Sequence, residues 1–280
     1  MTTVTIVLRG GLVHRDSSGN KQLFGTEQKN SNLYNGKHTQ WLSFGKGLIH
    51  ELMWDNDPSK RNQYGRRGIN DSIIHQELYQ IWIDLPNEKR YMEPRIELLG
   101  DEEETPTVID EKNDIQTTVI AGTYNNTSAS VDTITDLSIF RVQMKKPHRT
   151  WTYTPPSTQS TTIIYVRTGS IMIGNTQVPA HCTAYLSPPS SSSEDNGKDV
   201  IHIKSQEKNT DFLVLAGKPL HQKVTAKGSM VVETPQELEQ AFVEYERGEL
   251  GVPWSESLTD DEWRRHLRRT CKKETTIGRS

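Results

Sequence analysis

A histidine and a carboxylate stand side by side at His50 and Glu51, two residues beyond the glycine-rich stretch FGKG. Imidazole and carboxylate groups are both common ligands of metal ions in proteins. A metal site needs several such donors converging from different elements, so the pair is a candidate for the edge of a site. The alternative is structural: a histidine with a hydrogen-bond partner and a glutamate that faces solvent at a strand end.

The other metal-ligating residue types do not form a second pattern. No two of the histidines in the second half have His-x-His spacing, and no glutamate follows them at a useful interval (His148, His181, His202 and His221). We therefore expect no metal site there. The two cysteines, Cys182 and Cys271, are far apart, which excludes a disulfide framework and a cysteine zinc site and suits a reducing compartment.

The composition excludes several classes of partner. The 280 residues carry a formal net charge of −3, which gives no general attraction to nucleic acid or to an anionic membrane. No stretch approaches the roughly 20 apolar residues that a membrane helix needs. The first residues lack the basic start of a secretion signal. We expect a cytoplasmic or nuclear protein with no membrane partner.

The elements that must position His50 and Glu51 are strands. Short runs of alternating or apolar residues recur between glycine, asparagine and proline turns over the first two-thirds of the chain (near residues 2–8, 39–43, 79–83, 137–144, 161–179, 200–205 and 211–217). Such spacing is typical of an all-β sandwich or barrel. The stretches TVTIVLRGGLVHRDSSGN and TTIIYVRTGSIMIGNTQ share one pattern, which indicates two copies of a single β unit.

The C-terminal part is predicted to be helical. Thr234 has the features of an N-cap, with Pro235 at the first helical position and Glu237 completing a capping box, and Gly248 ends the helix. A second helix is expected after Thr259. The acidic run at 100–114 fits either a linker between two halves or a solvated loop within one domain. The predicted divisions are 1–114, 115–232 and 233–280.

Six stretches, in order from residue 2 to about 251, resemble the pirin family. They are TVTIVLRGGLVHRDSSGNK, QWLSFGKGLIHE, QIWIDLPNEKRYMEPR, TIIYVRTGSIMIGNTQVPA, DFLVLAGKPLHQKV and ETPQELEQAFVEYERGELG. The resemblance implies an all-β bicupin, that is, two β-barrels of the cupin type followed by C-terminal helices. The first barrel is expected to be incomplete at its start, as in an N-terminally truncated member.

The family resemblance also implies a metal and its ligands. In pirins the N-terminal barrel binds one Fe(II) through three histidines and a glutamate, and the C-terminal barrel is free of metal. His50 matches the third histidine, whereas the glutamate position is occupied by Leu52. The other two histidines belong to a His-x-His element preceding the strand matched by TVTIVL, where this sequence begins. His14, Arg15 and Asp16 match a hydrogen-bonding corner.

Glu51 is one residue out of register with the family's glutamate. Adjacent side chains of a strand point to opposite faces, so Glu51 and His50 cannot both face a barrel interior without a bulge. We therefore interpret His50 as the remnant ligand of a degenerate site and Glu51 as a weaker candidate. Fe(II) is expected to bind weakly or not at all.

Three hypotheses for function follow from the resemblance. The first is a regulatory scaffold that binds protein partners, including transcription regulators. The second is an iron-dependent dioxygenase acting on flavonols such as quercetin, and the third is a truncated form of a metal-binding pirin. No catalytic residue is assigned. The basic clusters at 60–67 and 264–273 lack an aromatic stacking platform, so no direct nucleic-acid contact is expected.

Overall fold

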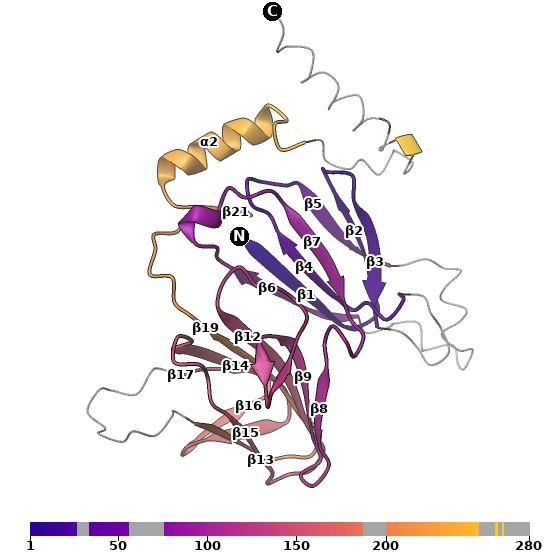
Figure 1. Cartoon of the computed structure of the whole chain (residues 1–280), viewed down its shortest axis with the longest axis vertical. Coiled ribbons are helices and arrows are strands. Elements are labelled where there is room, and N and C mark those ends of the chain that lie inside the picture. Colours follow the sequence, from indigo (N-terminus) through magenta and orange to yellow (C-terminus); the bar gives the residue numbers. More distant parts are fainter. Residues whose placement is uncertain (27–33, 56–75, 187–199, 252–260, 263–264, 266–280) are drawn as a thin grey trace, which may run out of the picture. The chain divides into compact units, whose positions relative to one another are not determined.

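The computed structural model describes residues 1–26, 34–55, 76–186, 200–251, 261–262 and 265. The chain divides into two compact units (Figure 1), of which the first comprises Met1–Leu99 with Gln222–Ser280 and the second Gly100–His221. The sequence had placed the divisions after residues 114 and 232. The difference arises because the chain from Gln222 onward packs with the first unit, and because the acidic run that begins at Gly100 is the start of the second unit.

The first unit contains two antiparallel sheets and a small hairpin. The larger sheet has the order β6-β1-β4-β7 and the smaller β3-β2-β5. The strands are β1 (Thr2–Arg9), β2 (Gly11–Asp16), β3 (Lys21–Gly25), β4 (Thr39–Ser43), β5 (His50–Trp54), β6 (Glu77–Ile83) and β7 (Arg95–Leu99), with the hairpin β20 (Thr225–Lys227) and β21 (Met230–Val232). A 3-10 turn, η2 (Asn87–Lys89), follows β6.

The first strand of the chain lies inside its sheet. β1 pairs with β4 along one side and with β6 along the other, so its backbone groups are used on both sides. The sequence analysis had predicted a first barrel that is incomplete at its start. In the described residues the edges of this sheet are instead β6 and β7.

The second unit repeats the arrangement of two facing sheets. Their orders are β17-β14-β19-β12-β9-β8 and β13-β18-β15-β16. The strands are β8 (Thr107–Asp110), β9 (Ile115–Ala121), β12 (Leu137–Met144), β13 (Thr150–Tyr153), β14 (Thr161–Thr168), β15 (Ser170–Ile173), β16 (Thr176–Pro179), β17 (Thr183–Leu186), β18 (Ile201–Ser205) and β19 (Thr210–Gly217), with the short hairpin β10 (Thr123–Tyr124) and β11 (Thr127–Ser128). Phe140, Trp151 and Phe212 are among the core residues between the sheets.

The predicted duplication is visible in the way each unit passes from one sheet to the other. β1 leads into β2, and β14 leads into β15, through a glycine with positive φ: Gly10 at 88° and Gly169 at 74°. In both units the ladder shifts register just before this glycine, between Val7 and Arg9 and between Val166 and Thr168. A bulge followed by a glycine lets a strand bend sharply into the opposite sheet.

The all-β prediction is confirmed, with one difference in detail. The predicted barrels are pairs of facing sheets, because the described strands of the two sheets are not joined by ladder pairing. The strands that flank FGKG, β4 and β5, lie in different sheets. The acidic run at 100–114 contains the edge strand β8, which pairs with β9, so it is part of the second unit.

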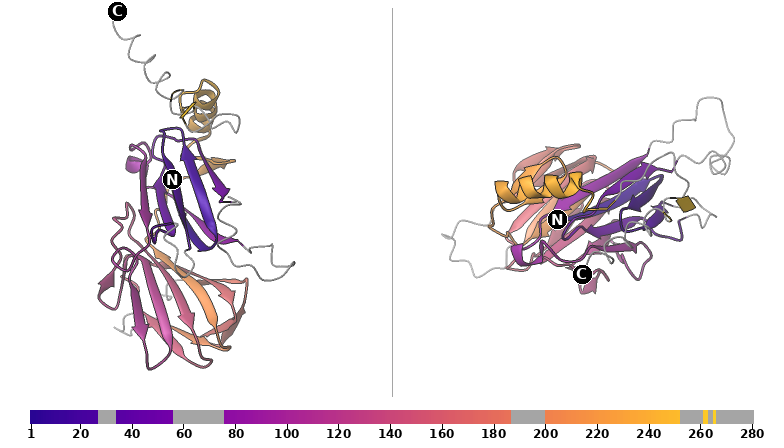
Figure 2. Two further views of the ribbon diagram at one scale, coloured as in Figure 1. Left: turned by 90° about the vertical axis from the view of Figure 1, so that its right-hand side faces the viewer. Right: turned by 90° about the horizontal axis from the view of Figure 1, so that it is seen from above.

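The C-terminal helix forms as predicted. α2 (Pro235–Glu246) begins at the cap Thr234, whose side chain accepts a hydrogen bond from the Glu237 amide, and Glu237 completes the capping box. The helix packs on the β20–β21 hairpin (Figure 2). Thr259, the expected cap of a second helix, lies outside the described residues. Residues 261–262 and 265 are described, and they are helical. In the part of the chain that is described, no helix is long and apolar enough to cross a membrane.

Replacing the cap tests how α2 is held. Thr234→Ala removes the oxygen that accepts from the Glu237 amide and is expected to cost about 1 kcal/mol of helix stability. Because α2 buries no residue fully, this loss should appear as faster amide hydrogen exchange in 235–246. Glu239→Ala, an exposed change within the same helix, should leave the exchange unchanged or slow it. Equal exchange in both variants would contradict the role of the cap.

Candidate functional site

His50 is the first residue of β5, and its register with β2 fixes the direction of its neighbours. The aligned pairs are Asp16 with His50, Arg15 with Glu51, and His14 with Leu52. Alternate residues share a face, so His50 and Leu52 lie on one side and Glu51 on the other. Leu52 packs against the core cluster of the first unit, which identifies its side as the inner one.

The loop before His50 depends on its two glycines. Gly45 has φ 52°, and a Cβ there would lie 1.8 Å from the Met92 carbonyl oxygen. Gly47 has φ 124°, and a Cβ there would lie 2.7 Å from Leu250. Both positions therefore need the missing side chain as well as the backbone freedom of glycine. The FGKG stretch is a tight turn that brings His50 close to the C-terminal segment.

The His14–Asp16 stretch forms a buried hydrogen-bonding corner. Asp16 accepts hydrogen bonds from the His14 ring at 3.1 Å, from the Ser18 amide and hydroxyl, and from the amide and side chain of Asn20. Burial alone would raise the pKa of Asp16. The hydrogen bonds from His14, Ser18 and Asn20 outweigh it and lower the pKa to about 2.

The lowered pKa makes Asp16 a source of stability at neutral pH. The pKa of about 2 in the folded protein lies below the ordinary value of 3.8, so ionised Asp16 should contribute about 2 kcal/mol above pH 4. This contribution should disappear as the pH falls from about 4 to about 2. Urea unfolding of Asp16→Asn should show a deficit at pH 7 that shrinks toward pH 3, whereas the exposed Glu88→Gln should follow the wild type. A deficit independent of pH would contradict this role.

The His50 side chain packs against two aromatic rings. Its ring centroid lies 4.9 Å from that of Phe44 and 5.6 Å from that of His14. Its Nδ1 atom is buried and unpartnered among the described residues. Burial, followed by the charge of His14, lowers the pKa of His50 to about 4 against the opposing effect of Asp16. The imidazole is therefore neutral at pH 7.

The titration of His50 is directly measurable. The C2–H proton resonance that disappears in His50→Gln should titrate with a midpoint near pH 4. Since the unfolded chain takes up this proton first, the free energy of unfolding should fall as the pH drops from about 6.5 toward 4. The part of this loss due to His50 should be absent in His50→Gln. A midpoint near 6.5 would show that the ring is hydrated.

The inner face around His50 is polar. Four other buried side chains there have an oxygen or nitrogen with no partner in the described part of the chain: Thr3 Oγ1, Thr5 Oγ1, His14 Nδ1 and Gln40 Oε1. The side chains of Gln40 and Gln22, on strands of opposite sheets, meet in a hydrogen bond of 2.9 Å. Buried polar atoms are nearly always satisfied, so this group marks a place for a ligand or bound water.

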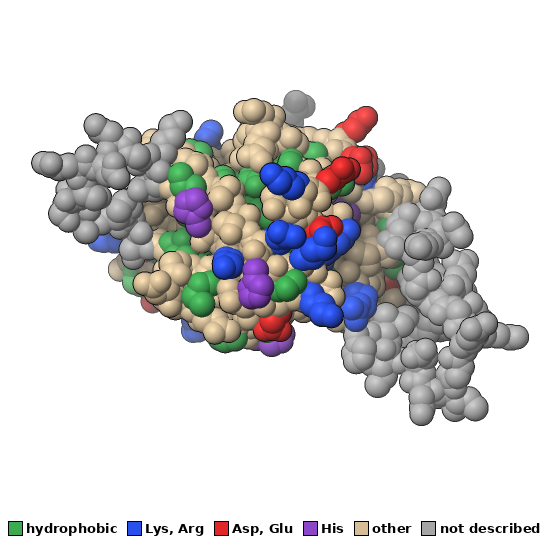
Figure 3. All heavy atoms as spheres, turned by 90° about the horizontal axis from the view of Figure 1, so that it is seen from below, with side chains coloured by type: hydrophobic (Ala, Val, Ile, Leu, Met, Phe, Trp, Pro, Cys, Tyr) green, Lys and Arg blue, Asp and Glu red, His purple; other side chains and the backbone are tan. Residues whose placement is uncertain are grey.

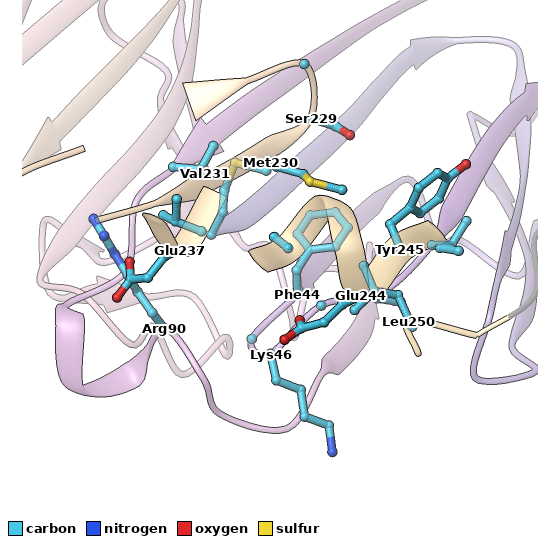
Figure 4. Close-up of a pocket in the computed structure, with 18 of the residues that line it drawn as sticks. Phe44, Lys46, Arg90, Ser229, Met230, Val231, Glu237, Glu244, Tyr245 and Leu250 are labelled. Atoms are coloured by element: carbon cyan, nitrogen blue, oxygen red, sulfur yellow. The ribbon is translucent and has the colours of Figure 1, made fainter. Parts of the chain in front are cut away.

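A cavity of about 960 Å³ opens beside this polar face, within the first unit (Figure 4). Thr3, His50 and Gln80 line it on the side of the sheets. The opposite wall comes from α2, the β20–β21 hairpin and Leu250. The apolar side chains that line the cavity include Phe44, Ile49, Trp82, Met230, Phe242 and Leu250. The volume is that of a site for a small molecule.

The inner face does not supply the ligand set of a metal site. His50 stands beside Leu52 where the resemblance requires a glutamate, and the Nε2 atom of His14 is engaged by Asp16. Glu51 lies on the other face, where its Oε1 atom is buried without a partner. Among the described residues, no three His, Cys, Asp or Glu side chains lie close enough together to hold an ion. These residues do not fit the four-ligand iron site.

The two predicted basic clusters, 60–67 and 264–273, lie outside the described residues except for Arg265. Figure 3 shows lysine and arginine side chains gathered with acidic ones on another face of the molecule. In the second unit Lys146 pairs with Asp114, and the Lys145 amide bonds to the Asp114 carbonyl. Mixed charge of this kind is not the continuous basic stripe of a nucleic-acid site. The expected absence of a nucleic-acid partner stays a prediction.

Sequence reasoning found the histidine but missed the cavity. The signal for the polar face was present: Thr3 and Thr5 alternate with Val4 and Ile6 in TVTIVL, which places two hydroxyls on one side of β1. The far wall carried no comparable signal. It depends on the C-terminal hairpin and α2 returning to the first unit, and no local pattern specifies that return.

Comparison with known proteins finds similarity to pirins. The pirin C-terminal cupin domain matches residues 141–251. Pirin-1 of Arabidopsis thaliana is 25% identical over 255 residues, covering 89% of this chain and 75% of that protein. The chain is similar to pirins over most of its length. The resemblance recognised in the sequence is thereby confirmed over most of its length.

Solved structures share the fold of this chain. A crystal structure of quercetin 2,3-dioxygenase from Acinetobacter baumannii superposes with a TM-score of 0.68 at 23% identity, covering 90% of this chain and 77% of that one. The bacterial pirin YhhW from Escherichia coli, crystallised in complex with nickel(II), gives a TM-score of 0.51 at 18% identity, covering 78% and 73%. At this identity the similarity establishes the cupin fold alone.

Proposed function

We propose that this chain is a regulatory protein whose first unit serves as a binding scaffold without a resident iron. The observation that carries the proposal is the β2–β5 register, which sets Leu52 beside His50 on the inner face and turns Glu51 away. A metal ion at the family's site would have the imidazole of His50 as a ligand and the apolar side chain of Leu52 beside it. A single histidine binds an ion too weakly to retain it. Transcription regulators in the cytoplasm or nucleus are the partners that the family suggests.

The second candidate is a dioxygenase of the quercetin type. It is favoured by the fold shared with the Acinetobacter enzyme and by a cavity large enough for a flavonol. Fe(II) would supply the chemistry of oxygen activation, but the described residues do not complete its ligand set. No step of that reaction is assigned to residues of this chain.

Metal content and turnover separate the two candidates. The purified protein, loaded with Fe(II) or Ni(II) and then dialysed, is expected to retain far less than one ion per chain. Oxygen consumption with quercetin should equal that of a sample treated with EDTA. Stoichiometric metal with turnover would overturn the scaffold in favour of the dioxygenase. The intact mass and N-terminal sequence of the native protein test whether a His-x-His element precedes Met1.

The Leu52 position offers a test by gain of function. Leu52→Glu puts a carboxylate on the same face as His50 and should raise Ni(II) affinity on the order of tenfold. Without metal, the Leu52→Glu variant should be less stable than the wild type, because it buries an unpaired charge. Binding of Ni(II) should restore its melting temperature.

The adjacent residue provides the matched control. Glu51→Gln changes a carboxylate on the opposite face and should leave metal affinity unchanged. If Leu52→Glu binds Ni(II) no better than the wild type, or if Glu51→Gln weakens binding, then position 52 is not the ligand position on the His50 face.

A further inference from the structure

The cavity beside His50 has a neutral floor. Three side chains form it: the hydroxyl of Thr3, the imidazole of His50 and the amide of Gln80. Thr3 is opposite Trp82 in the β1–β6 ladder, so Gln80 and Trp82 face the cavity on alternate positions of one strand. No carboxylate or basic side chain belongs to this floor.

The floor offers hydrogen bonds that nothing in the described chain uses. Thr3 Oγ1 and His50 Nδ1 are both buried without a partner, and Thr3 is only 2% exposed. The oxygen of Gln80 accepts from the Trp82 ring at 3.3 Å, which leaves the amide N–H groups of Gln80 as donors. A hydroxyl group, which both donates and accepts, matches this set.

The charged side chains at the cavity rim are each engaged elsewhere, and burial lowers the pKa of the Met1 α-amino group, which also lines the cavity, in favour of its uncharged form. Arg90 donates to Asp84 at 2.8 Å, Lys46 pairs with Glu93 at 2.7 Å, and Glu237 accepts from the amides of Glu233 and Thr234. Figure 4 shows the Lys46 side chain extending away from α2.

Two further charged residues at the rim, Lys227 and Glu244, also have partners. Lys227 lies 5.1 Å from the ring centre of Phe242, and Glu244 accepts from Gln240 at 2.9 Å. One nitrogen of Arg90, Nη1, has no hydrogen-bond partner within the described ranges, so a carboxylate is the competing head group. The ion pair with Asp84 already balances the charge of Arg90, which favours an uncharged ligand.

We propose that the cavity binds an uncharged apolar alcohol, with its hydroxyl between Thr3, His50 and Gln80 and its hydrocarbon body against Phe44, Met230 and Phe242. The ligand meets the unpartnered atoms of the floor and covers the apolar wall without separating any rim ion pair. This inference rests on the proposed function, because it makes the scaffold a metal-independent receptor for a small molecule.

A series that differs only in the head group tests the ligand class. 1-Octanol, octanoate and octylammonium are titrated by calorimetry into the full chain in the presence of EDTA. Octanol should bind at least about tenfold more tightly than either ion, since each ion loses hydration on a floor that offers no counter-charge. Equal or tighter binding of octanoate or octylammonium would overturn the proposal.

Two neighbouring threonines provide variant and control. Thr3→Val removes an unpartnered buried hydroxyl, so it should raise the melting temperature while weakening octanol binding by about fivefold. Thr2→Val, on the opposite face of β1, removes a hydroxyl bonded to Ser43 at 2.7 Å. That control should lower the melting temperature and leave octanol binding unchanged.

The outcome of each variant decides the matter. If Thr3→Val binds octanol as the wild type does, or melts earlier, its hydroxyl is satisfied by bound water and the proposal is wrong. Should Thr3→Val not fold, Gln80→Leu takes its place, and the same loss of octanol affinity is expected. If the proposed scaffold function is wrong, the protein retains metal and turns over quercetin. If the ligand inference alone is wrong, octanol binds no more tightly than octanoate or octylammonium.

Discussion

The turn that follows β2 holds the first unit's candidate site together. Asp16, ionised and buried, binds the amides of Ser18 and Asn20 and the ring of His14. This fixes Ser17, whose hydroxyl donates to the Leu250 carbonyl at 2.6 Å and accepts from the Ile49 amide at 3.1 Å. One turn thereby joins three segments that are distant in the sequence: β2, the loop before His50, and the end of the C-terminal segment.

The sequence allowed most elements and the fold class to be predicted, because strand alternation and helix capping are local signals. β12 and α2 occur where their patterns placed them, and the duplicated strand–glycine–strand motif occurs in both units. The domain limits and the cavity could not be predicted in this way. They depend on residues 222–251 joining the first unit, which is a tertiary choice with no periodic signature.

The candidate site was predicted only in part, for a related reason. His50 was found from its residue type, and the register argument that separated it from Glu51 agrees with the observed pairing. Its surroundings were not found, since Thr3, Thr5 and Gln40 are ordinary strand residues until two sheets face each other. The same place in a cupin can hold a metal site or a hydrogen-bonding pocket. The difference depends on the side chain two residues after His50 on the same face, which is Leu52 here.

The division of the chain has a consequence for its synthesis. The second unit is an insertion in the first, because Gly100–His221 interrupts the residues that make up the first unit. During translation this inserted unit can complete its core before the ribosome has made α2. Until then the apolar cavity side chains of the first unit, such as Phe44 and Trp82, lie uncovered. A chaperone that binds exposed apolar surface on nascent chains would therefore have a target in the first 99 residues.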